Sequence, residues 1–165
     1  MLIPLTIINW LQYNSETGIF IWTRCPGPSS PVGSVAGFLD KTTGYLHICF
    51  CNKDYKAHRL AWFFHYKTDP AELQVDHKNG VKTDNRIENL RLATYSQNIS
   101  NSKLRVDSTS KVKGVSWHKK DCKWHARVTI NGKSIHVGSF HSLEQAEAAI
   151  KLKRTELHKE FTNHG

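Results

Sequence analysis

The segment Val75-Asp76-His77-Lys78-Asn79-Gly80 decides how the middle of this chain folds, because a strand-like run ends there in an acid, a histidine and a turn signal. Gln74 to His77 has the length of a short strand, and Lys78-Asn79-Gly80 has the residue types of a turn. Successive side chains of a regular strand point to opposite faces, so Asp76 and His77 would point apart. They can serve one site only if the strand end bends at this turn.

A second strand and a helix follow. Leu90-Arg91-Leu92-Ala93 predicts a strand, and Thr94 followed by Gln97 is a capping-box signature, so a helix should begin there. The resulting order is strand, long polar loop, strand, helix. Asn98 falls in the first turns of the helix, which can pack across the hairpin.

These residue types can support phosphate chemistry. Asp76 can bind a hard metal ion, and His77, with an ordinary pKa near ~6.5, can take a proton from water at neutral pH. The formal charge of +9 favours a polyanionic partner such as nucleic acid, although ribosomal and membrane-surface proteins share such a charge. The simpler alternative is a polar turn in which Asn85 and Asn89 bond their own backbone.

The run VDHKNGVKTDNRIENLRLAT (75–94) together with Ser96-Gln97-Asn98 resembles the His-Asn-His (HNH) nucleases, which have a ββα-metal fold. It is most similar to the phage and intron homing endonucleases in which the last motif residue is Asn. His58-Arg59-Leu60-Ala61-Trp62 resembles the helix that precedes the motif. The resemblance covers roughly residues 45–101.

The resemblance implies a role for each motif residue. His77 would be the general base, and Asn89 would hold it through the side-chain carbonyl. Asp76 and Asn98 would be the metal ligands. Two oxygen ligands suit Mg²⁺ or Mn²⁺, one ion per active site, because Mg²⁺ takes the rest of its shell from water and substrate phosphate.

A different pattern begins at Gly114. Trp124, Ala126, Val128 and Ile130 alternate with polar residues, and Asn131-Gly132 predicts a tight hairpin. A further alternating strand follows, and Ser142 with Gln145 predicts the start of a helix with one apolar stripe. Three strands should therefore pack one face on one helix, with a polar outer face that is by default only solvated.

Residues 112–161 resemble the DNA-binding domain of plant ethylene-response factors. The resemblance rests on Lys113-Gly114-Val115, Lys123-Trp124, His136 to Phe140 and the Ala-rich helix from Glu144. In that family the sheet enters the major groove. The positions that align with its DNA contacts are Lys113, Ser116, His118, Lys120, Arg127, Thr129, Ser134 and His136. Several arginines and tryptophans of the plant pattern are replaced here, so no target sequence is implied.

The chain should be an α+β protein with a small antiparallel sheet before the nuclease motif. We expect a helix over Leu5 to Tyr13, strands at Ile19 to Trp22 and Gly44 to Phe50, and a helix from Ala57.

The expected domains are a nuclease domain at residues 1–102, with its ββα core at about 74–101, a polar linker at 103–112, and a DNA-binding domain at 113–165.

The remaining composition points to an intracellular protein without a membrane segment. No apolar run approaches the ~18 residues of a membrane span. The four cysteines form no CxxC pair and should be free thiols in a reducing cytoplasm. The histidines after the linker, His118, His125, His136 and His141, are expected to be scattered over strands and not clustered at metal spacing.

Together these features predict a metal-dependent DNA endonuclease that acts on double-stranded DNA, with no small-molecule cofactor and a monomer as the working expectation. A phage homing enzyme in the host bacterial cytoplasm, leaving a nick, is the favoured setting. The alternatives are a non-specific or restriction-type HNH nuclease, and a DNA-binding regulator with a silent site. Intact Asp76, His77, Asn89 and Asn98 argue against the last.

Overall fold

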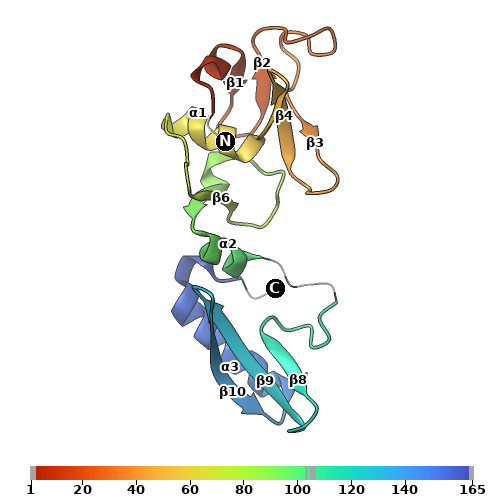
Figure 1. Cartoon of the computed structure of the whole chain (residues 1–165), viewed down its shortest axis with the longest axis vertical. Helices are drawn as coiled ribbons and strands as arrows, with labels where there is room; N and C mark the ends of the chain where they lie inside the picture. The colour runs from red at the N-terminus through yellow and green to blue at the C-terminus, as the bar shows by residue number, and fades with distance from the viewer. Residues whose placement is uncertain (1–2, 103, 105–106, 164–165) are drawn as a thin grey trace. The chain divides into compact units, whose positions relative to one another are not determined.

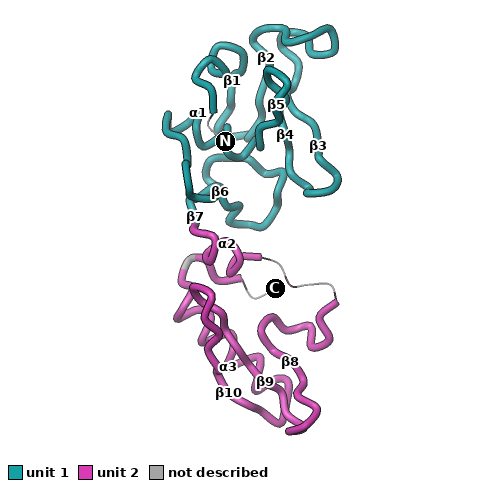
Figure 2. Tube along the Cα trace, in the orientation of Figure 1, with its two compact units in different colours: residues 1–93 teal, residues 94–165 magenta. Residues whose placement is uncertain are grey.

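A computed structural model describes residues 3–102, 104 and 107–163. The chain forms two compact units, Met1–Ala93 and Thr94–Gly165, which are coloured separately in Figure 2. Both are mixtures of helices with small antiparallel sheets, so the predicted α+β class is confirmed. None of the helices in the described part of the chain has the length and apolar character needed to cross a membrane.

Unit 1 contains three small antiparallel sheets around one α-helix (Figure 1). The sheets pair β1 with β2, β3 with β4 and β5, and β6 with β7. The elements are η1 (Leu5–Asn9), β1 (Leu11–Tyr13), β2 (Phe20–Trp22), β3 (Phe38–Leu39), β4 (Leu46–Phe50), β5 (Lys53–Lys56), α1 (Ala57–Tyr66), β6 (Gln74–His77), η2 (Ile87–Asn89) and β7 (Leu90–Ala93).

The helix expected over Leu5 to Tyr13 is correct only for its first half, as a 3-10 turn. Leu11 pairs with Trp22, and both are buried while Gln12 is exposed. This alternation of buried and exposed residues is that of a strand with one buried face. The pairing with β2 therefore outweighs the helical tendency that the apolar run suggested.

The core of unit 1 is built on α1. Leu60 and Ala61 have no exposed surface, and Phe64 meets Phe20 edge to face with ring centroids 5.4 Å apart. The helix begins directly after β5, at the expected Ala57, and ends where Lys67 takes a left-handed conformation (φ 56°). Buried aromatic and aliphatic contacts of this kind are the main source of stability in a unit this small.

The β6–β7 hairpin, predicted from the sequence, is present. Its register pairs Asp76 with Arg91 and His77 with Leu90. The loop between the strands is closed at its base, where the Lys78 N–H donates to the Asn89 carbonyl at 2.8 Å. His77 therefore stands at the last paired position of β6, where the chain turns into the loop.

Unit 2 is a three-stranded antiparallel sheet with a helix on one face, in the strand order β10-β9-β8. Ala126 and Val128 face Ala146 and Ile150 of the helix in one buried cluster. Asn131 and Gly132 both have positive φ, as the predicted hairpin turn requires. The elements are α2 (Tyr95–Asn101), β8 (Val115–His118), β9 (Lys123–Ile130), β10 (Lys133–Phe140), α3 (Leu143–His158) and η3 (Lys159–Phe161).

Helix α2 belongs to unit 2. Thr94 caps it in the predicted capping box. The Asn131 N–H donates to the Ser96 hydroxyl at 2.9 Å, and the Asn163 side chain donates to the Asn101 carbonyl at 2.7 Å. The boundary between the two compact units therefore lies between β7 and α2. The linker expected at 103–112 stays a prediction, and residues 103, 105 and 106 of it lie outside the described residues.

A close backbone contact joins the turn before β2 to the β6–β7 loop. Gly18 has a φ of +75°, and a Cβ placed there would lie 2.6 Å from both the Arg86 nitrogen and the Asn85 carbonyl carbon. The Ile87 N–H donates to the Ser15 carbonyl at 3.0 Å, and the Tyr13 hydroxyl donates to the Asn85 carbonyl at 2.7 Å.

We expect Gly18→Ala to lower the free energy of unfolding of unit 1 by about 1–3 kcal/mol, because backbone must shift to admit the methyl group. Gly33→Ala is the matched control, since Gly33 also has a positive φ (+85°) but no atom within 4 Å of its Cβ position. Urea unfolding followed by NMR signals of β6 and β7 measures both variants. Equal midpoints for the two would mean that the close approach contributes nothing beyond backbone strain.

Candidate active site

His77 lies in a buried cluster of rings. Only 4% of its surface is exposed, and its ring meets that of His58 on α1 edge to face at 5.0 Å. The Tyr45 ring is 6.0 Å from His77 and 4.9 Å from His58. Burial lowers the pKa of His77 from its ordinary value, against opposing contributions from the Asn85 contact and the Asp76 charge. The ring is therefore neutral at pH 7 and able to accept a proton.

The amide of Asn85 contacts the histidine. Its Oδ1 lies 3.1 Å from His77 Nε2, and Asn85 is almost completely buried. An amide oxygen only accepts hydrogen bonds, so this contact places the proton of the neutral ring on Nε2 and leaves Nδ1 unprotonated. Asn85 had been expected only as a loop residue. The sequence hardly predicts this contact, because the spacing of the loop asparagines does not indicate which side chain points toward His77.

Asn89 closes the loop that carries Asn85. Its Oδ1 accepts the Asn79 N–H at 3.0 Å, and its Nδ2 donates to the Asp84 carbonyl at 2.9 Å. We had expected Asn89 to be the acceptor for His77, whereas in the structure the Asn85 oxygen occupies that position. The physical reason is the position of Asn89 at the end of η2, where its side chain meets loop backbone.

Asp76 forms a buried ion pair across the hairpin. Arg91 Nε donates to Asp76 Oδ2 at 2.9 Å, and the two side chains are 12% and 6% exposed. The pairing follows from the register, which places the two residues opposite each other. A buried carboxylate needs such a partner to remain charged. The sequence predicted both strands but not this pair, because it depends on which residues face each other.

A second ion pair shapes the loop. Arg86 donates to both oxygens of Asp84 at 2.8 Å, and Asn79 Nδ2 donates to Asp84 Oδ2 at 2.8 Å. The Arg86 hydrogen bonds, followed by that of Asn79, lower the pKa of Asp84 to about 2. Asp84 therefore stays ionised. It holds the loop together by accepting hydrogen bonds from Asn79, Arg86 and Asn89.

Positive charge surrounds the ring cluster. The ammonium groups of Lys56 and Lys82 lie 5.0 and 4.8 Å from the centroid of the Tyr45 ring, and Lys82 also donates to the Thr43 carbonyl at 2.7 Å. Burial, more than the neighbouring charges, lowers the pKa of His58 well below its ordinary value. His58 is therefore an uncharged packing partner of His77, while the lysines supply a field that favours phosphate.

The predicted site residues are divided between the units. Asp76, His77 and Asn89 are brought together at the base of one loop in unit 1. Asn98 is a half-buried residue of α2 in unit 2. Its role as the second metal ligand stays a prediction.

Most of the expected DNA-contacting residues line the outer face of the unit 2 sheet or its turns. The register places Arg127 beside His136 and Thr129 beside Ser134, and all four are exposed. The others are Ser116 and Lys120, both exposed, and His118, which is half-buried. Lys113 differs, because its ammonium donates to the Ser100 carbonyl at 2.9 Å. Burial and the Arg154 charge lower the pKa of Lys113 to about 8.

All four cysteines are exposed free thiols, as expected.

Comparison with known proteins gives one family match and one relative. Residues 55–99 match the family model described as HNH endonuclease. This range includes His58, Asp76, His77, Asn85 and Asn89 but not Tyr45. The chain is also 37% identical over 92 residues to Protein 3.8 of Escherichia phage T7, an alignment that covers 56% of this chain and 75% of that protein.

The family match ends at residue 99, so the resemblance of residues 112–161 to the plant DNA-binding domain stays a prediction. The chain therefore contains an HNH endonuclease domain at residues 55–99 and belongs to the same family as Protein 3.8 of phage T7.

Proposed function

We propose that the chain is a metal-dependent DNA endonuclease in which His77 removes the proton from the attacking water. The observation that carries this proposal is the buried, neutral His77 with Asn85 Oδ1 at 3.1 Å from Nε2. A general base must be unprotonated before the reaction. Burial favours the unprotonated ring, and the Asn85 contact places the proton of the neutral ring on Nε2.

The proposed reaction is the hydrolysis of a phosphodiester bond. His77 Nδ1 takes a proton from water while the water oxygen bonds to phosphorus, and the bond from phosphorus to the 3′ oxygen breaks. The products are a 5′-phosphate and a 3′-hydroxyl, whose proton comes from solvent. His77 then returns its proton to water. Lys56 and Lys82 favour the approach of the phosphate backbone.

The donor set fits a hard divalent cation. Asp76 offers a carboxylate and Asn98 an amide oxygen, the ligand types that Mg²⁺ and Mn²⁺ take in proteins, and no sulfur is involved. These two residues would hold the ion. When bound, Mg²⁺ supplies stabilisation of negative charge on the phosphate and on the leaving oxygen.

The C-terminal sheet is proposed to direct the nuclease to its substrate, double-stranded DNA. Its outer face offers Arg127, Thr129, Ser134 and His136 in two neighbouring cross-strand pairs. Phosphate contacts are the safer part of this proposal, since most protein–DNA hydrogen bonds go to the backbone. With one site per chain, a nick by a site-selective phage enzyme in the host cytoplasm is the proposed outcome.

His77→Ala should lower the rate of plasmid nicking by at least ~10²–10⁴-fold while leaving DNA binding intact, because it removes the general base. Gel analysis of supercoiled plasmid with Mg²⁺ measures cleavage, and the same reaction with excess chelator gives the background. His65→Ala is the control, since His65 is an exposed residue of α1. A folded His77→Ala protein that nicks at the parental rate would end the assignment.

Cleavage by the parental protein should rise with pH along an acid limb whose midpoint lies below the ~6.5 of an ordinary histidine. The sign follows from burial, which disfavours protonated His77, so the active neutral form persists to lower pH. Asn85→Ala removes a contact that favours the protonated ring and should move the midpoint lower still. Profiles of kcat/KM at two Mg²⁺ concentrations separate this proton from metal binding. A midpoint above 6.5 would contradict a buried base.

Arg127→Ala should weaken DNA binding and reduce the slope of log affinity against log salt by ~0.9, the value for one lost phosphate contact. Lys151→Ala on α3 is the control for loss of one charge, because Lys151 pairs with Glu147 on the helix. Fluorescence anisotropy with a labelled duplex at several salt concentrations gives both slopes. The same slope for Arg127→Ala and Lys151→Ala would mean that the sheet face does not touch DNA.

A further inference from the structure

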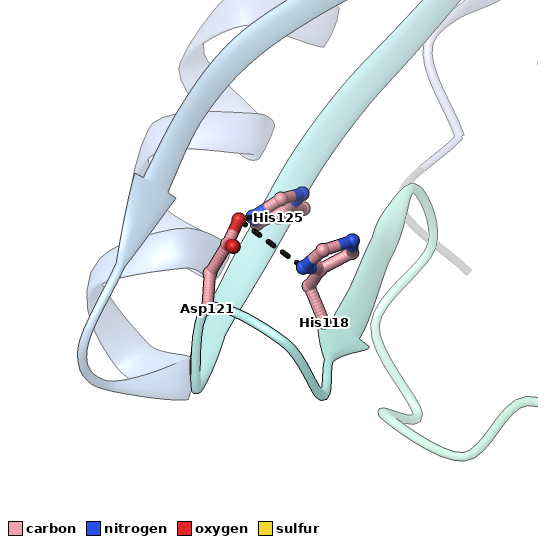
Figure 3. A group of neighbouring side chains, drawn as sticks. All are labelled: His118, Asp121 and His125. Carbon is pink, nitrogen blue, oxygen red and sulfur yellow. Dashed lines mark ion pairs between the residues drawn. The ribbon is translucent and has the colours of Figure 1, made fainter.

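Three side chains with metal-ligand atoms meet at one end of the unit 2 sheet (Figure 3). They are His118 at the end of β8, Asp121 in the following turn and His125 on β9. One ligand atom from each lies within 4.8 Å of the other two. This corrects the expectation from the sequence, which treated His118 and His125 as scattered residues.

The hairpin explains how they meet. The register pairs Ser116 with His125 and His118 with Lys123, so His118 and His125 are diagonal neighbours on the same face. The turn between the strands passes through Cys122, which has a positive φ of 48°, and brings Asp121 to the same two rings. The spacing His-x2-Asp-x3-His becomes a cluster only because the chain reverses between the histidines.

Three ring nitrogens of the cluster, His118 Nδ1 and both nitrogens of His125, are buried without a hydrogen-bond partner. Asp121 Oδ2 lies 3.1 Å from both His118 Nδ1 and His125 Nε2, yet neither nitrogen makes a hydrogen bond of acceptable direction. His125 is 8% exposed, and both of its ring nitrogens are buried without a hydrogen-bond partner. Unsatisfied buried nitrogen atoms are costly, so the convergence of His118 Nδ1 and His125 Nε2 on one oxygen calls for an explanation.

Ion pairing alone explains the arrangement poorly. The two imidazole rings stack 4.4 Å apart with an interplanar angle of 5°, so protonation of both would place two positive charges face to face. If both rings are neutral, one carboxylate oxygen must accept from two donors that do not point along good hydrogen-bond directions. A cation shared by all three groups removes both difficulties.

The spacing suits a small tetrahedral ion. Zn²⁺ binds histidine nitrogen and carboxylate oxygen at about 2.0–2.1 Å, which puts neighbouring tetrahedral ligand atoms roughly 3.3 Å apart. The two oxygen–nitrogen separations of 3.1 Å are close to this value, and the nitrogen–nitrogen separation lies within 4.8 Å, so binding requires the two rings to turn toward each other.

We propose that His118, Asp121 and His125 bind Zn²⁺ at the β8–β9 hairpin, separately from the hydrolytic ion. Two imidazoles select a borderline-soft ion over Mg²⁺, which prefers oxygen ligands. With three protein ligands, a fourth position is open to water or to an oxygen of a DNA phosphate. The ion would order the turn that carries Lys119 and Lys120 and add positive charge beside the outer sheet face.

Zinc affinity of the full-length chain tests the proposal, measured by competition with a chromophoric chelator in excess Mg²⁺. We expect one equivalent of Zn²⁺ per chain. Asp121→Asn, at an exposed turn position, should weaken binding by more than the roughly 10–100-fold that second-shell substitutions cost. His141→Asn and Cys122→Ser, an exposed histidine and an exposed thiol of the same unit, should not change it.

A second readout identifies the ligands directly. X-ray absorption of the zinc complex should show only nitrogen and oxygen neighbours, with the outer-shell features of two imidazoles. Loss of one equivalent of binding in Asp121→Asn, with an unchanged circular dichroism spectrum, would support the site. Absence of stoichiometric binding by the parental chain, full retention by Asp121→Asn, or a sulfur neighbour lost in Cys122→Ser would overturn it.

Discussion

The candidate active site depends on one side-chain amide, that of Asn89. Its oxygen accepts the Asn79 N–H and its nitrogen donates to the Asp84 carbonyl, so a single residue ties the two ends of a polar loop together. Turns and the ion pairs of Asp84 with Arg86 add to this closure, and Ile87 packs the end of the loop against the core. Asn85, which contacts His77, lies within this closed loop, and its carbonyl also accepts from the Tyr13 hydroxyl.

The buried histidine and the buried acid have different electrostatic surroundings. Burial lowers the pKa of His77 and favours its uncharged ring, whereas the Asp76 carboxylate pairs with the Arg91 guanidinium. Adjacent residues on one strand thus have opposite electrostatic environments, because the alternation of the strand turns them to different neighbours.

The local elements of this fold could be predicted from the sequence, and the tertiary contacts of the site could not. The capping box at Thr94, the Asn131-Gly132 turn and the start of α1 at Ala57 depend on short-range chemistry, and all three are correct. The choice between Asn85 and Asn89 depends on which amide turns inward, a property of the closed loop. The strand at Leu11–Tyr13 was missed for a similar reason, because its partner β2 lies beyond a turn.

The contacts of Gly18 bear on how far this active site can be treated as a transferable module. The segment that matches the HNH endonuclease family begins at residue 55, yet the loop at Asn85 to Ile87 is held by Tyr13, Ser15 and Gly18. The hairpin of β1 and β2 is therefore part of the scaffold of the site, although it contributes no reacting group. Residues 55–99 cut out or grafted elsewhere would carry the motif but lose the surface that shapes it. The contacts that hold the candidate site therefore extend beyond the segment by which the family is recognised.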